Sequence, residues 1–259
     1  MEKQVDILIV GAGISGIGIA AHLTKNNPKR KFDIIERRAS FGGTWDLFKY
    51  PGIRSDSDMS TFGFNFKPWR KANVLADGES IKGYIGEVVD EYKLKDKIHF
   101  NHRVLSANYD SSTKKWHVQI EDANQKTQTW IANFVLGCTG YYNYDQGFQP
   151  DFPNQEAFKG QLIHPQFWPE NLDYAGKKVV IIGSGATAIT LVPAMAKGGA
   201  GHVTMLQRSP TYIASIPSID FVYDKTRKFM SEDLAYKFTR ARNIGMQRGI
   251  FALSKKQPQ

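Results

Sequence analysis

The sequence predicts an α/β protein made of two Rossmann-like βαβ dinucleotide-binding units, with a small antiparallel β insert and an incomplete second unit. An apolar strand, a glycine-rich turn and a helical segment follow one another over residues 5–25, and the same order recurs over residues 178–197. Short segments of alternating polarity between residues 104 and 131 supply the insert. A chain of 259 residues is long enough for one large domain or two small ones.

The first unit opens on a buried parallel strand at residues 5–10, which ends at Gly11. Apolar residues at helical spacing predict a helix over residues 14–25, and residues 32–36 form the next strand. Strand, helix and strand within about 30 residues make a βαβ unit. Further along we expect a loop at residues 41–69 and a helix at residues 80–92. Three short antiparallel strands follow at residues 104–109, 116–120 and 129–131, and a last buried strand at residues 134–137.

Proline, glycine and asparagine are frequent in residues 143–172, which we interpret as a linker between domains. A second strand, helix and strand are predicted at residues 178–182, 186–197 and 202–206. A last helix begins after Ser231, a residue type that caps helix N-termini. The predicted domains are therefore residues 1–142, the linker 143–172, and residues 173–259 with a basic helical tail.

The composition limits the function classes. The net charge of +9 invites a nucleic-acid partner, but residues 221–259 alone hold nine Lys or Arg against three Asp or Glu. We interpret this local excess as a solvated helical face, so no nucleic-acid partner is expected. A surface for anionic cofactors or lipid is the alternative. No apolar stretch is long enough for a transmembrane segment, and no signal peptide is evident. The single cysteine, Cys138, is expected to be structural and fits a cytoplasmic location, and no metal-ligand spacing is present.

The first glycine turn has the spacing of Gly11, Gly13 and Gly16 between a strand and a helix. The first glycine permits the tight turn, the second lets the backbone approach a pyrophosphate, and the third packs helix on strand. Ser15 lies inside this turn and is assigned to the same site. Glu36, which ends the second strand 20 residues later, is placed to accept hydrogen bonds from a ribose. The alternative is a glycine turn without a ligand.

The second glycine turn repeats the pattern with Gly183, Gly185 and Ala188, and Ala186 and Thr187 lie inside it. Twenty residues beyond Ala188 stands Arg208, followed by Ser209, in place of an acid. A guanidinium pairs with a 2′-phosphate, so this site is predicted to prefer NADPH over NADH. The alternative is a surface arginine at a strand end. Two dinucleotide sites in one chain imply hydride transfer between two cofactors.

Two longer motifs point to a family. Residues 42–56 read GGTWDLFKYPGIRSD and residues 158–169 read FKGQLIHPQFWP. Both resemble, in composition and order, the motifs of class B flavoprotein monooxygenases, the Baeyer–Villiger monooxygenase family. Within it, the stretches 54–59, 140–144 and 206–212 are similar to the ethionamide-activating FAD-containing group. The resemblance extends from about residue 4 to about residue 250.

The resemblance implies FAD at the first turn and NADPH at the second. It implies a reaction with O₂ through a C4a-peroxyflavin, which oxygenates a ketone, the sulfur of a thioether, or a nitrogen atom. It places Gly43, Thr44 and Trp45 in the flavin region and Thr139 and Gly140 at the end of the FAD domain. It makes Asp56 a catalytic residue near the reactive edge of the flavin, and His164 one that couples domain motion to turnover. Turn formation by Asp56 and ordinary packing of His164 are the alternatives.

The chain is shorter than the family's members, which continue through the rest of both domains. The family's catalytic arginine belongs to that later part and has no counterpart after Arg208. A cofactor-binding remnant without oxygenation, at most an uncoupled NADPH oxidase, is therefore the alternative function. Apolar residues of the tail predict a homodimer through the truncated face, with docking of the tail helix onto the chain's own sheet or aggregation as alternatives. The substrate itself is not readable from the sequence.

Overall fold

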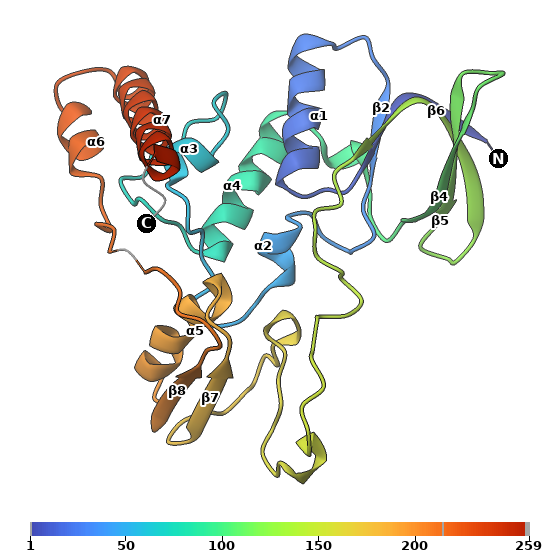
Figure 1. Ribbon diagram of the computed structural model, residues 1–259. Coiled ribbons are helices and arrows are strands. Elements are labelled where there is room, and N and C mark those ends of the chain that lie inside the picture. The colour runs from blue at the N-terminus through green and yellow to red at the C-terminus, as the bar shows by residue number, and fades with distance from the viewer. Residues whose placement is uncertain (1, 214, 257–259) are drawn as a thin grey trace. The chain divides into compact units, whose positions relative to one another are not determined.

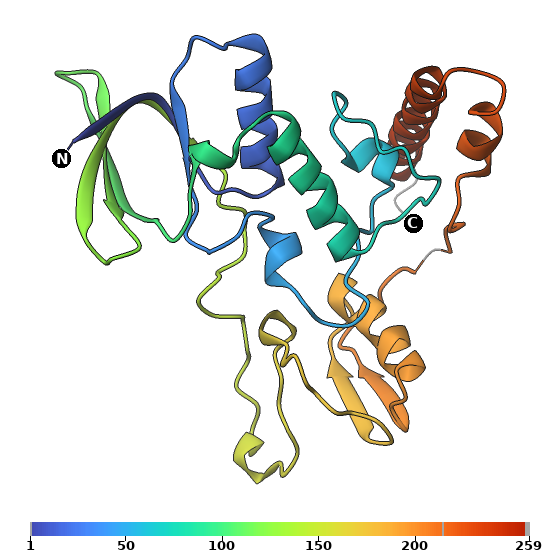
Figure 2. The ribbon, with the colours of Figure 1, turned by 180° about the vertical axis from the view of Figure 1, so that it is seen from behind.

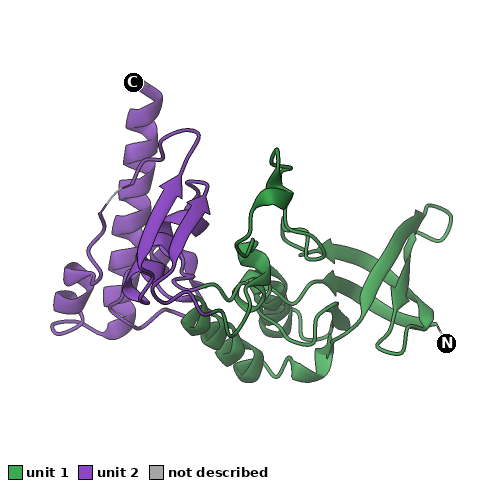
Figure 3. Ribbon diagram, turned by 90° about the horizontal axis from the view of Figure 1, so that it is seen from below, with its two compact units in different colours: residues 1–50, 78–172 green, residues 51–77, 173–259 purple. Residues whose placement is uncertain are grey.

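The computed structural model describes residues 2–213 and 215–256. Contacts divide the chain into two compact units (Figure 3): residues 1–50 with 78–172, and residues 51–77 with 173–259. These units differ from the predicted boundaries at two places. Residues 143–172 pack within unit 1 and are not a separate linker, and residues 51–77 belong to unit 2. Such grouping depends on contacts between residues far apart in sequence, which local composition does not reveal.

Unit 1 is built on one six-stranded sheet in the order β3-β2-β1-β6-β5-β4 (Figure 1). The first four of these strands run parallel, and β4 and β5 add an antiparallel extension to β6. This confirms the predicted parallel unit with a small antiparallel insert. The strands are β1 (Lys3–Val10), β2 (Phe32–Ile35), β3 (Ile98–His99), β4 (Arg103–Asp110), β5 (Lys115–Glu121) and β6 (Thr127–Gly137).

Strand β6 joins the two parts of this sheet. Its residues 127–132 pair with β5 and its residues 130–137 pair with β1, so the two separate strands predicted at residues 129–131 and 134–137 are one. The prediction that the second segment is buried was wrong, since Phe134 is 59% exposed. The buried cluster on β6 is formed by Trp130 and Ala132 and does not extend to Phe134.

Two helices with apolar residues at helical spacing pack in unit 1. Helix α1 (Ile14–Asn26) buries Ile17, Ala20 and Ala21, and helix α4 (Gly78–Glu91) packs beside it (Figure 2). Helix α4 buries apolar residues at the three- and four-residue spacing of one helix face. A one-turn helix, α2 (Thr44–Leu47), contacts α4. Short 3₁₀ helices are η1 (Lys95–Lys97), η2 (Gln155–Ala157) and η3 (Pro165–Phe167).

Unit 2 contains the second βαβ unit at the predicted bounds. The parallel strands are β7 (Lys178–Ile182) and β8 (His202–Leu206), and helix α5 (Ala186–Lys197) connects them. Helix α5 lies against the strands and buries Ala188, Leu191 and Met195. Val180, Ile182 and Leu206 are 53–60% exposed, so apolar side chains of both strands lie open in this structure.

The C-terminal helices pack on residues 51–77. Helix α7 (Glu232–Lys256) follows α6 (Phe221–Thr226), and it contacts the one-turn helix α3 (Met59–Phe62). Arg240 donates to the backbone oxygens of Ser60 (2.6 Å) and Thr61 (3.2 Å), and Arg242 forms an ion pair with Asp220. These two arginines are thus bound internally, whereas the other basic residues of the tail are exposed, as expected for a solvated face. Among the described residues, no helix is long and apolar enough to cross a membrane.

Candidate functional site

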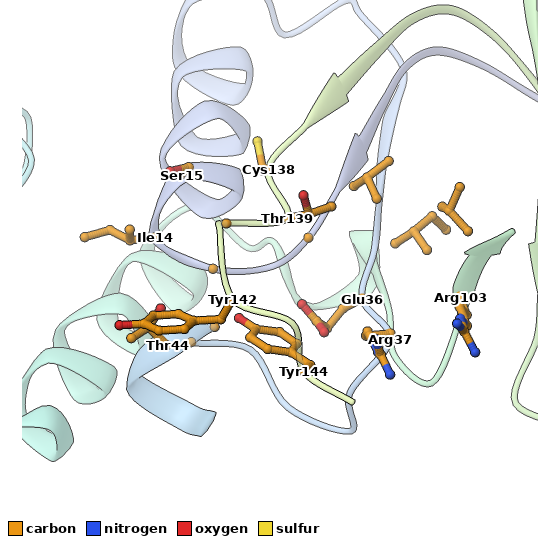
Figure 4. Close-up of a pocket in the computed structure, with 18 of the residues that line it drawn as sticks. Ile14, Ser15, Glu36, Arg37, Thr44, Arg103, Cys138, Thr139, Tyr142 and Tyr144 are labelled. Atoms are coloured by element: carbon orange, nitrogen blue, oxygen red, sulfur yellow. The ribbon is translucent and has the colours of Figure 1, made fainter. Parts of the chain in front are cut away.

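A pocket of about 450 Å³ lies in unit 1, at the carboxyl ends of the parallel strands β1, β2 and β6 (Figure 4). Ligands of open α/β sheets bind at this edge. Nine of the predicted cofactor-binding residues line the pocket together: Gly11, Gly13, Ser15, Glu36, Gly43, Thr44, Trp45, Thr139 and Gly140. The topology explains this convergence, because each of these segments follows or adjoins the end of a parallel strand.

The three glycines of the first turn differ in why they are glycines. Gly11 has φ +108° and a Cβ there would lie 2.5 Å from the carbonyl oxygen of Cys138. A Cβ on Gly16 would overlap the carbonyl oxygen of Gly11. Gly13 has extended backbone angles, and a Cβ there would lie 3.6 Å from Cα of Gly43, an ordinary contact. The fold therefore requires Gly11 and Gly16, whereas at Gly13 the missing side chain serves to keep the pocket open.

Glu36 is 4% exposed and lies at the end of β2 beside the glycine turn. One of its carboxylate oxygens accepts a hydrogen bond from the backbone N–H of Ala12 (2.8 Å), and the other from that of Arg38 (2.9 Å). Each oxygen keeps a second lone pair, so the carboxylate can also accept from a hydroxyl group in the pocket. The acid predicted to bind a ribose therefore also holds the glycine turn in place.

Several pocket residues were missed by sequence reasoning, among them Arg37, His102, Arg103, Tyr142 and Tyr144. Figure 4 shows Arg37 and Arg103 at one end of the pocket and the two tyrosine rings along its lower side. The position of Arg37 directly after Glu36, and the tyrosine-rich stretch after Gly140, were the available signals. His102 precedes β4 and Arg103 is its first residue, and no local sequence motif marks either of them.

The segment after Gly140 is held against the pocket by charge. Arg37 forms a two-pronged ion pair with Asp145, and the hydrogen bond from Arg37 lowers the pKa of the Asp145 carboxyl. Burial raises the pKa of the Tyr144 hydroxyl, and burial also raises the pKa of Tyr142 to about 12. Both tyrosines therefore stay neutral at physiological pH and can act as hydrogen-bond donors.

The predicted residue His164 lies in unit 1. Its Nδ1 accepts a hydrogen bond from the backbone N–H of Gln166 (3.2 Å) and so caps η3. Gly147 packs flat against the imidazole, where a side chain on Gly147 would overlap the ring. The buried amide of Gln166 donates to the backbone oxygen of Asn143 (2.7 Å). The segment that contains His164 is thus docked on residues 143–147, which adjoin the pocket.

The second glycine turn lies in unit 2. The N–H of Gly183 donates to the backbone oxygen of Leu206 (2.8 Å), and Gly185 is the N-cap of α5. The following residues Ala186 and Thr187 form the first turn of the helix. A Cβ on Gly185 would meet nothing within 4 Å, so the fold does not require this glycine. Gly185 therefore resembles Gly13, because the fold tolerates a side chain at both positions.

Hydroxyl groups connect this turn to the segment after β8. The hydroxyl of Thr211 donates to the backbone oxygen of Ser184 (2.7 Å), and the hydroxyl of Ser184 donates to the backbone oxygen of Ser209 (3.2 Å). Arg208, in the same segment, is exposed. The predicted residues Arg208 and Ser209 are therefore brought next to the second glycine turn. Asp56 is also exposed in unit 2 and does not line the pocket of unit 1.

Two glycine turns, each between a parallel strand and the N-terminus of a helix, define a protein of the dinucleotide-binding α/β class. The particular family follows from comparison. Residues 2–224 match the family model described as flavin-binding monooxygenase-like, and the chain belongs to this family. The predicted membership among the flavoprotein monooxygenases is confirmed.

Named relatives are similar over the whole chain. It is 81% identical to a probable FAD-binding monooxygenase AlmA of Acinetobacter baylyi, and 54% identical to the FAD-containing monooxygenase EthA of Mycolicibacterium smegmatis. Both alignments cover 100% of this chain and 52% of the relative. The chain therefore spans about half the length of the curated relatives it matches.

Solved structures agree with the family. An oxidized steroid monooxygenase bound to NADP is 27% identical with a TM-score of 0.74, over 91% of this chain and 43% of that one. An open crystal structure of cyclohexanone monooxygenase is 25% identical with a TM-score of 0.77, over 93% of this chain and 46% of that one. The two-turn α/β arrangement is thus shared with known monooxygenases.

Proposed function

We propose that this chain is the cofactor-binding part of an FAD- and NADPH-dependent monooxygenase, with FAD in the pocket of unit 1 and NADPH at the second glycine turn. The observation that carries the proposal is Gly13, which faces the pocket as a glycine although the fold tolerates a side chain there. The names of the relatives, which are FAD-binding or FAD-containing monooxygenases, support the choice of flavin.

The residues of the pocket fit FAD. The backbone at Gly13 and the free N–H groups at the N-terminus of α1 suit a pyrophosphate, and Glu36 suits the ribose hydroxyls. Gly43, Thr44 and Trp45 also line the pocket, and we propose that they contact the flavin. When bound, FAD supplies the redox chemistry, since it accepts a hydride from NADPH and its reduced form reacts with O₂.

The second turn fits NADPH. The N-terminus of α5 at Gly185 suits the pyrophosphate, and the exposed guanidinium of Arg208 suits the 2′-phosphate. Ser209, which follows Arg208, adds a hydroxyl donor, and its backbone oxygen accepts a hydrogen bond from Ser184 of the glycine turn. The bound NADP of the steroid monooxygenase supports this assignment.

The substrate class follows from the relatives. Cyclohexanone monooxygenases are among the solved neighbours, so we propose a ketone or a thioether as substrate and O₂ as co-substrate. The resemblance of their motifs to the family, and not the pocket geometry, is the basis on which we propose that Asp56 acts near the flavin and His164 couples domain motion to turnover. A cytoplasmic location and a homodimer complete the proposal.

One observation favours a second function. The apolar residues Val180, Ile182 and Leu206 of the NADPH-binding sheet are open to solvent. Among the described residues nothing covers these side chains beside the proposed NADPH site, and a reduced flavin that reacts with O₂ where water has access releases hydrogen peroxide. An uncoupled NADPH oxidase is therefore the second candidate.

The test is an aerobic reaction of the purified 259-residue chain with FAD, NADPH and a panel of ketones and thioethers. Oxygenated product in proportion to NADPH consumed supports the monooxygenase. Hydrogen peroxide in the same proportion supports the oxidase. A folded chain that neither retains FAD nor oxidises NADPH contradicts both.

A further inference from the structure

An ion cluster with a buried carboxylate lies next to residues 43–45, which line the unit 1 pocket. The carboxylate of Asp46 is 8% exposed and has one cation on each oxygen. Lys82 Nζ lies 2.6 Å from Oδ1, while Arg38 approaches Oδ2 with Nη2 at 2.8 Å and Nε at 3.1 Å. We refer to Arg38, Asp46 and Lys82 as the Asp46 cluster.

The three members of the Asp46 cluster come from three different parts of unit 1. Asp46 lies on α2, directly after the pocket residues 43–45, and Lys82 lies on α4. Arg38 follows β2, and its backbone N–H donates to Glu36. The guanidinium of Arg38 also lies over the ring of Tyr144, 5.9 Å from its centroid. Helix α4, helix α2, the residues after β2 and the Tyr144 segment therefore meet through one carboxylate and one guanidinium.

The cluster is charged in the folded state. Burial by itself raises the pKa of the Asp46 carboxyl, but the hydrogen bonds from Lys82 and Arg38 outweigh burial and hold that pKa below its usual value. A buried ion pair with good geometry adds little net stability compared with apolar packing, yet it defines one arrangement of its partners. The geometry thus suits a group that positions other segments.

We propose that Asp46 is a positioning residue for FAD, which holds the segment 42–45 in its binding geometry before the cofactor arrives. This inference rests on the proposed function, since it concerns the site to which FAD is assigned. Helix α2 has only four residues and no side-chain cap, and beyond its backbone hydrogen bonds the ion pairs of Asp46 link this segment to α4 and to the residues that follow β2. Holding a binding segment in advance avoids the ordering cost that otherwise reduces affinity.

The test compares FAD affinity with stability in matched variants. Asp46→Asn keeps the shape and removes the charge, and Asp46→Glu restores the charge. Asp90→Asn is the control, because Asp90 is an exposed carboxylate on α4, the helix that carries Lys82. FAD dissociation constants come from quenching of flavin fluorescence, and thermal unfolding of the FAD-free chains is followed by circular dichroism.

We expect FAD to bind about tenfold or more weakly to Asp46→Asn, partial recovery in Asp46→Glu and no change in Asp90→Asn. Lys82→Met, which removes one of the two cations from a half-exposed position, should give a smaller loss and serves if Asp46→Asn does not fold. Wild-type affinity for FAD in folded Asp46→Asn overturns the positioning role and leaves the proposed function intact. If Asp46→Asn does not fold, wild-type affinity in folded Lys82→Met does the same. Failure of the wild-type chain itself to bind FAD overturns both.

Discussion

Replacing Gly13 by alanine separates the requirements of the cofactor from those of the fold. The new Cβ would lie 3.6 Å from Cα of Gly43, so no neighbour has to move. Alanine reduces the freedom of the unfolded chain, which stabilises by about 0.4–1 kcal/mol, and is a poorer N-cap by a similar amount. The free energy of unfolding should therefore change by less than about 1 kcal/mol.

Cofactor binding should respond much more strongly to the same methyl group. It lies on the surface that Gly13 presents to the pocket, where the pyrophosphate has to approach the backbone. Losing one charge-assisted hydrogen bond to a phosphate costs about 1.5–3 kcal/mol, which corresponds to roughly a ten- to a hundredfold weaker affinity for FAD. Equilibrium titration with FAD, followed by flavin fluorescence, measures this loss.

Gly16→Ala is the matched comparison. Its Cβ would overlap the carbonyl oxygen of Gly11, so the turn between β1 and α1 would have to shift. Overpacking of this kind costs about 1–3 kcal/mol or more, and thermal unfolding of the FAD-free chain should show it. Unchanged FAD affinity in Gly13→Ala would refute the reasoning. So would an equal loss of thermal stability in the two variants.

Three further outcomes are expected. Arg208→Ala should weaken NADPH binding about ten- to a hundredfold and leave NADH almost unaffected, since only NADPH carries the 2′-phosphate; equal losses in two titrations would contradict that assignment. Because the pKa of Asp46 is lower in the folded than in the unfolded chain, its contribution to stability is present at neutral pH and is lost as the pH falls below about 4. The difference in Tm between wild type and Asp46→Asn should therefore narrow in acid, and a constant difference argues against the ion pairs. The open apolar side chains of β7 and β8 should bind a hydrophobic dye or form a dimer. Given the net charge of +6 on residues 221–259, such a dimer should strengthen with salt if the tails meet, and a monomer without dye binding at any salt concentration contradicts this.

The elements that contain the glycine turns could be predicted from sequence because local signals coincide there. At residues 178–206 the apolar runs, the glycine spacing and the helical segment all agree, and the predicted bounds of β7, α5 and β8 match the structure. The first turn is equally clear, and Glu36 lies where the spacing placed it. Each of these features depends on residues close together in sequence.

Other features depend on contacts that no local pattern records. Strand β6 was predicted as two strands because its two halves pair with different partners and bury different side chains. Residues 51–77 have the composition of a loop, and their membership of unit 2 rests on bonds such as that between Arg240 and Ser60, which are 180 residues apart. The Asp46 cluster is hidden for the same reason, since Lys82 lies 36 residues from Asp46.

Binding of FAD by unit 1 is measured by the flavin content of the purified chain after titration with FAD and desalting. We expect one FAD per chain, a shifted flavin absorption spectrum, and loss of both in Gly13→Val with the circular dichroism spectrum retained. A chain that folds, as judged by circular dichroism, yet stays colourless and leaves the fluorescence of added FAD unchanged would show that unit 1 does not bind FAD.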